Sequence, residues 1–152
     1  MKKVIIVYES KYGNTRLVAE MIAKGLNQFP DVEATVAEVA RVDPELTVNY
    51  DALLIGSPNH IGGPTRGISK FIGRLGKLDL KHKWMAVFDT YTGNDFQKAM
   101  RKMEQQLSRK VHGIILIAPG LSIRVDQTKG PVASGEHPKC EEFGVGFAVQ
   151  MA

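Results

Sequence analysis

The segment Val4-Ile5-Ile6-Val7-Tyr8-Glu9-Ser10-Lys11-Tyr12-Gly13-Asn14-Thr15 decides the fold, because it runs from an apolar stretch through a small polar turn into a helix. The apolar stretch has the composition of a buried strand. From Asn14 onward, apolar residues recur at helical spacing: Leu17, Val18, Met21, Ile22 and Leu26. A helix N-terminus carries unpaired N–H groups and a partial positive charge, so hydroxyl residues and a glycine at this turn predict a phosphate-binding site.

The composition indicates one domain spanning residues 1–152, since 43% hydrophobic residues can fill one substantial core but the chain is short for two. The N-terminal apolar run ends at Glu9, before it reaches the length of a signal peptide, and no other stretch could span a bilayer. The single cysteine, Cys140, excludes an internal disulfide and a multi-cysteine metal site. These features are typical of a reducing cytosol, so we expect a cytoplasmic protein without membrane insertion.

The charge is mildly basic, with 20 Lys and Arg against 16 Asp and Glu and a formal net charge of +4. The basic residues are scattered along the chain instead of forming a run with aromatic residues between them. A nucleic-acid partner is therefore not expected. The sequence contains no indication of an oligomeric state.

Apolar runs alternate with segments of helical periodicity along the chain. Strands are expected near residues 3–8, 33–39, 51–57, 83–89 and 112–119. The alternation is typical of a parallel sheet with helices on both faces, a three-layer α/β sandwich. Ligands of such sheets bind beyond the carboxyl ends of the strands, so we expect the chemistry in the loops at residues 9–15, 57–65 and 89–95.

The later helices are predicted from apolar stripes at helical spacing. One stripe consists of Ile68, Phe71, Ile72 and Leu75, and another of Phe96, Met100, Met103 and Leu107 with Asn94 or Asp95 as N-cap. A third, of Cys140, Phe143, Phe147 and Met151, predicts a closing helix that covers the first strand's side of the sheet and buries Cys140. Residues 40–50 predict a short helix or turn, and residues 119–138 an irregular excursion rich in Gly, Pro and Ser.

The three strand-end loops resemble those of the flavodoxin family, and the resemblance spans the whole chain. Ser10-Lys11-Tyr12-Gly13-Asn14-Thr15 is similar to the phosphate turn of flavodoxins, in the form found in the flavodoxin domain of A-type flavoproteins. Gly56-Ser57-Pro58-Asn59-His60 resembles the loop that passes along the flavin ring, and Asp89-Thr90-Tyr91-Thr92-Gly93 lies where flavodoxins present an aromatic residue to that ring. The resemblance implies a flavodoxin-like fold, with a five-stranded parallel sheet of order 2-1-3-4-5, and FMN as the cofactor.

The resemblance also implies a role for each loop. The hydroxyls of Ser10 and Thr15 and the N–H groups of the turn would bind the FMN phosphate, while Lys11 adds charge or points into water. Asn59 and His60 would lie near the ring beside the flexible pair Gly62 and Gly63, and Tyr91 would stack on it. The implied cofactor-binding residues are Ser10, Lys11, Tyr12, Gly13, Asn14, Thr15, Ser57, Pro58, Asn59, His60, Ile61, Gly62, Gly63, Thr90, Tyr91, Thr92 and Gly93. They include no catalytic side chain and no metal ligand.

Several functions are compatible with this fold. We favour an electron carrier that shuttles electrons between redox partner proteins over an enzyme that resembles the NAD(P)H:quinone oxidoreductases. A third alternative keeps the fold but binds FMN weakly, because residues 59–61 occupy the loop in which many flavodoxins place a large aromatic residue. A receiver domain is disfavoured because Gly56-Ser57-Pro58 stands where a phosphorylatable Asp is required, and a low-molecular-weight phosphatase because the first loop has no cysteine.

Overall fold

The computed structural model describes residues 1–152. Its strands are β1 (Lys2–Tyr8), β2 (Val32–Glu38), β3 (Ala52–Pro58), β4 (Trp84–Tyr91), β5 (Ile115–Leu116) and β6 (Leu121–Arg124). Its α-helices are α1 (Asn14–Leu26), α2 (Arg66–Leu75), α3 (Lys98–Lys110) and α4 (His137–Met151), and the short 3-10 helices η1 (Val39–Arg41) and η2 (Pro44–Asn49) connect β2 to β3. These two short helices confirm the prediction for residues 40–50. None of the helices combines the length and the apolar character needed to cross a bilayer.

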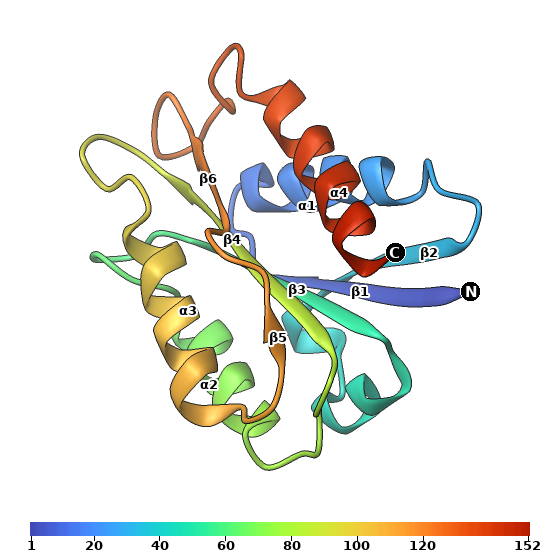
Figure 1. The fold of residues 1–152 in the computed structure, drawn as a ribbon. Helices are drawn as coiled ribbons and strands as arrows, with labels where there is room; N and C mark the ends of the chain where they lie inside the picture. Colours follow the sequence, from blue (N-terminus) through green and yellow to red (C-terminus); the bar gives the residue numbers. More distant parts are fainter.

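The strands form a parallel sheet in the order β2-β1-β3-β4-β5, which confirms the predicted order, and β6 also pairs with β4. β1 lies between β2 and β3, and its residue Val4 is opposite Ala34 of β2 and Ala52 of β3. Figure 1 shows α1 and α4 on one side of this sheet and α2 and α3 on the other. Because the strands are parallel, their carboxyl ends lie at one edge of the sheet, where the loops of the predicted site begin.

The pleat of the strands divides the core into two layers. Val4 and Ile6 point into the layer that α1 and α4 cover, whereas Ile5 and Val7 point into the layer that α2 and α3 cover. Cys140 of α4 is fully buried in the first of these layers. The closing helix therefore covers the side of the sheet that the sequence predicted, and the cysteine is buried as expected.

Two glycines allow α1 and α4 to pack closely against each other. A Cβ atom at Gly25 would lie 2.1 Å from the carbonyl oxygen of Glu141, and one at Gly144 would lie 2.1 Å from the carbonyl oxygen of Ile22. Neither distance is possible between a real side chain and the backbone, which has no freedom to move away inside a helix. The close crossing therefore depends on the absence of a side chain at both positions.

The prediction of a single fifth strand over residues 112–119 is wrong in its extent. β5 is only two residues long, and the outer strand continues as β6, within the segment that was predicted to be irregular. Between the two pieces, β4 residues 86–87 face residues 117–120, so two extra residues interrupt the ladder. The break contains Pro119, which has no N–H for the ladder, and Gly120, whose N–H is donated at 2.8 Å to a carboxylate of α3.

Two details of the helix predictions are also wrong. α3 begins at Lys98, so neither Asn94 nor Asp95 caps it, and Phe96 lies outside the helix with 54% of its surface exposed. Side chains of β4 and β6, far away in sequence, accept hydrogen bonds from the chain at the start of α3 instead of a local cap. Leu17 of α1 is 38% exposed, because the buried face of this helix is centred on other residues: Val18, Ala19, Ile22 and Ala23.

Candidate functional site

The loops after β1, β3 and β4 meet at the carboxyl edge of the sheet, on the left of the view in Figure 1. The hydroxyls of Thr15 and Thr90 are hydrogen-bonded at 2.9 Å, and the N–H of Asn59 donates to the carbonyl of Thr90 at 2.7 Å. At the end of β1, the N–H of Glu9 donates to the carbonyl of Gly56 at 3.1 Å. Residues from all three predicted loops therefore form one connected region.

The first loop is a turn with a cluster of free N–H groups. Gly13 has a left-handed conformation, with φ of 91°, and its N–H donates to the Ser10 hydroxyl at 3.0 Å. No side chain caps α1. The N–H groups that donate to no atom of the protein include those of Tyr12, Asn14, Thr15 and Arg16. Unpaired N–H groups at the positive end of a helix dipole make this turn a site for an anion such as a phosphate.

The Thr15 hydroxyl is buried and connects the first loop to the third. Its partner at 2.9 Å is the hydroxyl of Thr90 in β4. Each hydroxyl has one proton and can accept two hydrogen bonds. When Thr90 donates to Thr15, the proton of Thr15 remains free for an anion bound at the turn. The pair can thus hold the two loops together and still leave a donor for a ligand.

The second loop contains a tight hairpin turn with strained backbone. The N–H of His60 donates to the carbonyl of Gly63 at 2.6 Å, and the N–H of Gly63 donates back at 3.2 Å. The two residues between them, Ile61 and Gly62, have φ values of 51° and 74°, as in a type I′ turn. A β-branched residue rarely adopts this conformation, yet the Ile61 side chain is 92% exposed and gains no packing from it.

We predict that Ile61→Asn stabilises the protein by about 1 kcal/mol in the absence of any flavin, because Asn tolerates the left-handed conformation that isoleucine resists. Urea unfolding of the flavin-free protein measures this change. Ile61→Val is the matched control, because valine is also β-branched and should give no gain. Equal stability of the Asn and Val variants would show that the turn is not strained.

The third loop begins with Tyr91, the last residue of β4. Its ring is half-buried and makes an edge-to-face contact with Phe96, with the ring centroids 5.5 Å apart and an interplanar angle of 63°. Burial, reinforced by the negative charge of Glu136, raises the pKa of the Tyr91 hydroxyl above its usual value. The side chain is thus a neutral aromatic surface at the edge of the site. Beyond it, Gly93 adopts a left-handed conformation with φ of 60°.

Each of the three loops has a glycine that faces open space. A Cβ atom built at Gly13, Gly62 or Gly93 would have no other atom within 4 Å, and all three residues have positive φ. A ligand can therefore approach the backbone of each loop without meeting a side chain at these positions. This arrangement, together with the free N–H groups of the first turn, fits a ligand that has a flat ring system and a phosphate group.

The start of the second loop is held by groups that the sequence interpretation did not single out. The Thr65 hydroxyl donates to the Glu9 carboxylate and also caps α2 by accepting from the N–H of Ile68. Ser57, predicted as a ligand contact, is buried in β3, accepts from the N–H of Thr65 at 3.0 Å and donates to the carbonyl of Pro58 at 2.9 Å. In this arrangement the Ser57 side chain connects the start of the loop at Pro58 to its end at Thr65. Thr65 after Pro64 is a helix N-cap signal that could have been recognised.

A fourth segment, residues 125–135, lies beside the first turn and was missed by the sequence interpretation. The N–H of Val125 donates to the carbonyl of Tyr91 at 2.8 Å, which extends the ladder of β4. Gly130, with φ of 111°, packs so closely that a Cβ atom there would lie 2.7 Å from the Asn14 side chain. The segment therefore contacts both the first and the third loop and belongs to the same region. Its sequence carries only turn signals, which do not indicate where a loop lies.

Asp89, at the end of β4, is hydrogen-bonded to β6 and to the start of α3. Its buried carboxylate accepts hydrogen bonds from the Ser122 hydroxyl at 2.6 Å and from the N–H of Met100 at 2.9 Å, and Ser122 in turn accepts from the N–H of Gln97 at 2.9 Å. These bonds replace the local N-cap that the sequence predicted for α3. Burial raises the pKa of Asp89 to about 6, although both hydrogen bonds act in the opposite direction.

The raised pKa of Asp89 predicts a pH dependence of stability. The folded protein binds this proton more tightly than the unfolded chain, so the contribution of Asp89 is greatest below pH 4 and is lost as the pH rises through about 6. We expect the free energy of unfolding of the wild type to fall by about 2 kcal/mol relative to Asp89→Asn between pH 4 and pH 8. Urea unfolding at several pH values measures this change. Asp31→Asn, at an exposed position, is the control, and parallel curves for the wild type and Asp89→Asn would contradict the prediction.

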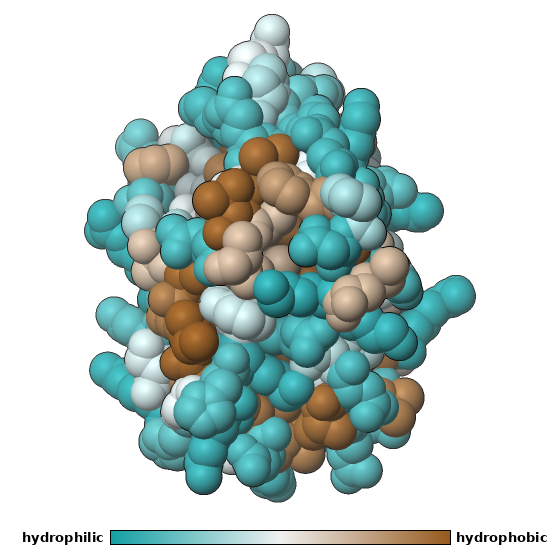
Figure 2. Space-filling model, turned by 45° about the vertical axis from the view of Figure 1, so that its right-hand side comes forward, coloured by the Kyte–Doolittle hydropathy of each residue, from teal (hydrophilic) through white to brown (hydrophobic).

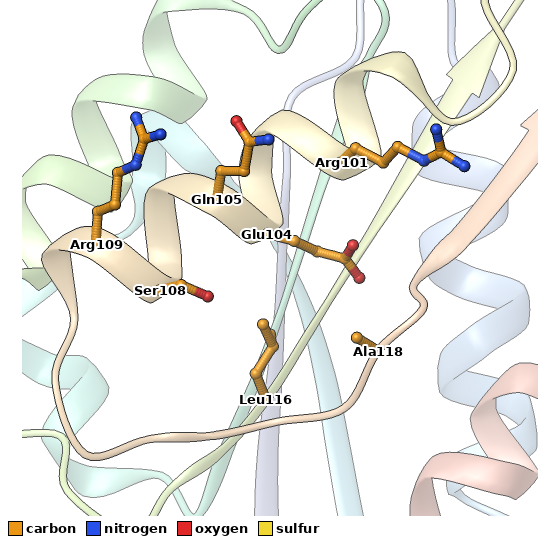
Figure 3. A pocket seen from close by; sticks show the side chains of 7 residues that line it. All are labelled: Arg101, Glu104, Gln105, Ser108, Arg109, Leu116 and Ala118. Atoms are coloured by element: carbon orange, nitrogen blue, oxygen red, sulfur yellow. The ribbon is translucent and has the colours of Figure 1, made fainter.

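A separate pocket lies between α3 and the connection from β5 to β6 (Figure 3). It is lined by Arg101, Glu104, Gln105, Ser108, Arg109, Leu116 and Ala118. Glu104 extends toward the connection between β5 and β6 and accepts from the N–H of Gly120 at 2.8 Å. The pocket thus results from the interruption of the outer strand, and none of its residues belongs to the predicted site.

Comparison with known proteins identifies the family. The sequence profile described as Flavodoxin matches residues 6–134. The chain belongs to the flavodoxin family. The fold predicted from the sequence and the recognition of the family are thereby confirmed, and FMN is the cofactor of flavodoxins.

Individual flavodoxins and flavodoxin-like domains resemble the chain to different extents. A flavodoxin from Aquifex aeolicus is 32% identical over 62 residues, which cover 41% of this chain and 34% of that protein, so the match spans about a third of the relative. The crystal structure of oxidised Flavodoxin 2 from Bacillus cereus superposes with a TM-score of 0.83 and 28% identity, over 97% of this chain and 99% of that one. The Flv1 flavodiiron core from Synechocystis sp. PCC6803 has the same fold, with a TM-score of 0.79 and 21% identity over 99% of this chain and 36% of that one.

Proposed function

We propose that the protein binds FMN without a covalent bond and carries electrons between redox partner proteins. The observation that supports this most strongly is the first turn, where the free N–H groups of Tyr12, Asn14, Thr15 and Arg16 lie at the positive end of α1. Family membership supplies the cofactor and the broad role, and the turn offers a site for the cofactor's phosphate.

Each loop contributes a different kind of contact in this proposal. The N–H groups of the turn and the hydroxyls of Ser10 and Thr15 hold the phosphate. In the second loop, the N–H groups of Ile61 and Gly62 donate to no atom of the protein, so they and the loop carbonyls would pair with the polar groups along the ring edge. Tyr91 would lie against one face of the ring and the exposed aliphatic side chain of Ile61 against the other, in place of the aromatic residue that many flavodoxins have there. The His60 side chain is exposed beside the hairpin turn of the second loop.

The protein supplies position and electrostatics, while FMN, when bound, accepts and releases the electrons. No acid, base or nucleophile of the chain is required for this role. The only thiol, Cys140, is buried in the core, and burial raises its pKa to about 12, so it is not a reactive group. We place the protein in the cytoplasm because a single buried cysteine is typical of a reducing compartment.

The test of the proposed function is to purify the protein, record its absorption and identify the released cofactor by mass spectrometry. We expect a yellow protein that releases FMN, is reduced by a chemical reductant and is not reduced rapidly when mixed with NADPH in a stopped-flow instrument. Rapid reduction by NADPH would instead support an oxidoreductase of the quinone reductase type. A colourless protein that does not take up added FMN would identify a chain that keeps the fold without the cofactor.

A further inference from the structure

We propose that the rim of the site docks an acidic surface of the redox partner. The inference rests on the proposed function, because it concerns the partner of the same site. It is drawn from the charges and apolar side chains that surround the loops, and it specifies the chemistry of a partner that the family membership leaves open.

The segments that surround the site carry all of the net charge of the chain. These are residues 9–16, 57–66, 89–102 and 124–139, and each has one more basic than acidic residue, so together they account for the formal charge of +4, with one of the charges, Arg101, at the pocket beside α3. The remainder of the chain is neutral by the same count. A positive field is therefore concentrated at the carboxyl edge of the sheet, where the flavin is proposed to bind.

At this edge, several basic side chains but few carboxylates have no ion-pair partner. Four carboxylates at this edge are paired: Glu20 with Arg16, Asp95 with Lys98, Asp126 with Arg124 and the buried Glu136 with Lys139. Glu9 has no basic partner within 4 Å but accepts from the Thr65 hydroxyl. Lys11, Arg66, Lys102 and Lys129 are exposed and form no ion pair. These last residues are the free cations of the rim.

Side-chain contacts place Lys102 and Lys11 beside the loops, and chain neighbours place Arg66 and Lys129 there. The Lys102 side chain lies along Gly63 of the second loop, with its Nζ 3.5 Å from where a Cβ atom would be. The Lys11 Nζ lies 5.4 Å from the centroid of the Tyr12 ring. Arg66 follows Thr65, which is bonded to the end of β1, and Lys129 precedes Gly130, which packs against the first turn. The free cations therefore surround the site on several sides.

Apolar side chains are exposed between these cations. Tyr12, Ile61 and Phe96, one from each loop, are 42%, 92% and 54% exposed. Figure 2 shows that hydrophobic residues also form separate patches on another face of the molecule. At the loops, these exposed apolar residues are combined with the free cations. Apolar contacts within a charged, solvent-accessible rim are typical of protein interfaces, with the rim determining which partner approaches and how fast.

The charge selects one kind of occupant. A second copy of this chain would bring two positive rims together, and a basic partner would be repelled in the same way. A redox protein with carboxylates around its redox centre has the complementary charge. Such a partner can bring its centre close to the proposed flavin position while the free cations pair with its carboxylates.

The test measures docking and electron transfer separately, using an acidic [2Fe–2S] ferredoxin as the probe. The rim variant is Arg66→Glu, Lys102→Glu, Lys129→Glu, and the control variant has the same change of charge at exposed positions of the opposite edge: Lys24→Glu, Lys77→Glu, Lys110→Glu. Calorimetric titration at low salt gives the affinity. Stopped-flow mixing of reduced ferredoxin with the oxidised, FMN-loaded protein follows transfer of one electron from the cluster to the flavin.

We expect the rim variant to weaken ferredoxin binding at least 10-fold and to slow electron transfer by a similar factor, with less than a 2-fold effect in the control variant. The effect should shrink as the salt concentration rises. Equal behaviour of the two variants, or tighter binding of a DNA duplex than of ferredoxin, would overturn the docking proposal. Ferredoxin binding that depends on the rim without any electron transfer would leave the docking intact and contradict the proposed function instead.

Discussion

Ser10→Asp should weaken FMN binding by about 100-fold while leaving riboflavin binding within about 3-fold of the wild type. The new carboxylate can accept the hydrogen bond from the N–H of Gly13 that the serine hydroxyl accepts now, so the turn keeps its shape. Its negative charge, however, lies beside the position proposed for the phosphate dianion. The variant would lose the hydrogen bond from the serine hydroxyl to the phosphate and gain repulsion between two negative groups. Together these changes should reduce the binding free energy of FMN by about 3 kcal/mol.

The comparison of the two flavins makes this prediction specific. Riboflavin has the same ring but no phosphate, so only FMN should respond to a charge at the turn. Fluorescence titration of both flavins measures the two affinities. Ser108→Asp, an exposed position on α3, introduces the same charge away from the loops and should change neither affinity. If Ser10→Asp weakened both flavins equally, the turn would be a contact for the ring or a structural element, and the phosphate assignment would be wrong.

Gly144→Ala should destabilise the protein by about 2–4 kcal/mol, although alanine is the better helix former by about 1 kcal/mol. The added Cβ atom would lie 2.1 Å from the carbonyl oxygen of Ile22. α1 and α4 would have to separate, which would open the core layer around Val18, Ile22 and Phe147. Chemical denaturation followed by circular dichroism measures the loss.

The same helix provides the control for this prediction. Gly146 is exposed, and a Cβ atom there would have no other atom within 4 Å. Gly146→Ala should therefore stabilise the protein by up to about 1 kcal/mol, through helix propensity alone. Opposite signs at two glycines only two positions apart would show that the effect comes from the helix crossing. A stabilising effect at both positions would mean that α4 does not pack against α1 as closely as described.

The sequence specifies most of the architecture because its strongest signals are local. The apolar runs of β1, β3 and β4 and the stripe of Ile68, Phe71, Ile72 and Leu75 each depend on residues a few positions apart, and the structure confirms them. The prediction of the fifth strand failed because the interruption of this strand depends on a tertiary contact, in which the N–H of Gly120 donates to Glu104 of α3. The prediction of the start of α3 failed for the same reason, since Asp89 and Ser122 accept the hydrogen bonds that a local N-cap residue would accept.

The candidate site was predictable in its location but less so in its internal contacts. The rule that ligands bind at the carboxyl ends of parallel strands selected the three loops, which do lie together. Spacing along the chain could not indicate that Thr15 is bonded to Thr90, that Ser57 braces the start of the second loop, or that Ile61 has a left-handed conformation. Nor could it place residues 125–135 beside the first turn, because turn residues specify local geometry without a direction in space.

Amide NMR tests whether the N–H groups of the first turn bind a phosphate. Spectra of the ¹⁵N-labelled protein would be compared with FMN bound and with riboflavin bound. We predict that the amide protons of Tyr12, Asn14, Thr15 and Arg16 move downfield with FMN and stay near their flavin-free positions with riboflavin, while amides of the second and third loops respond alike to both flavins. If the amide signals of the first turn did not move when FMN was bound, the turn would not be the phosphate site.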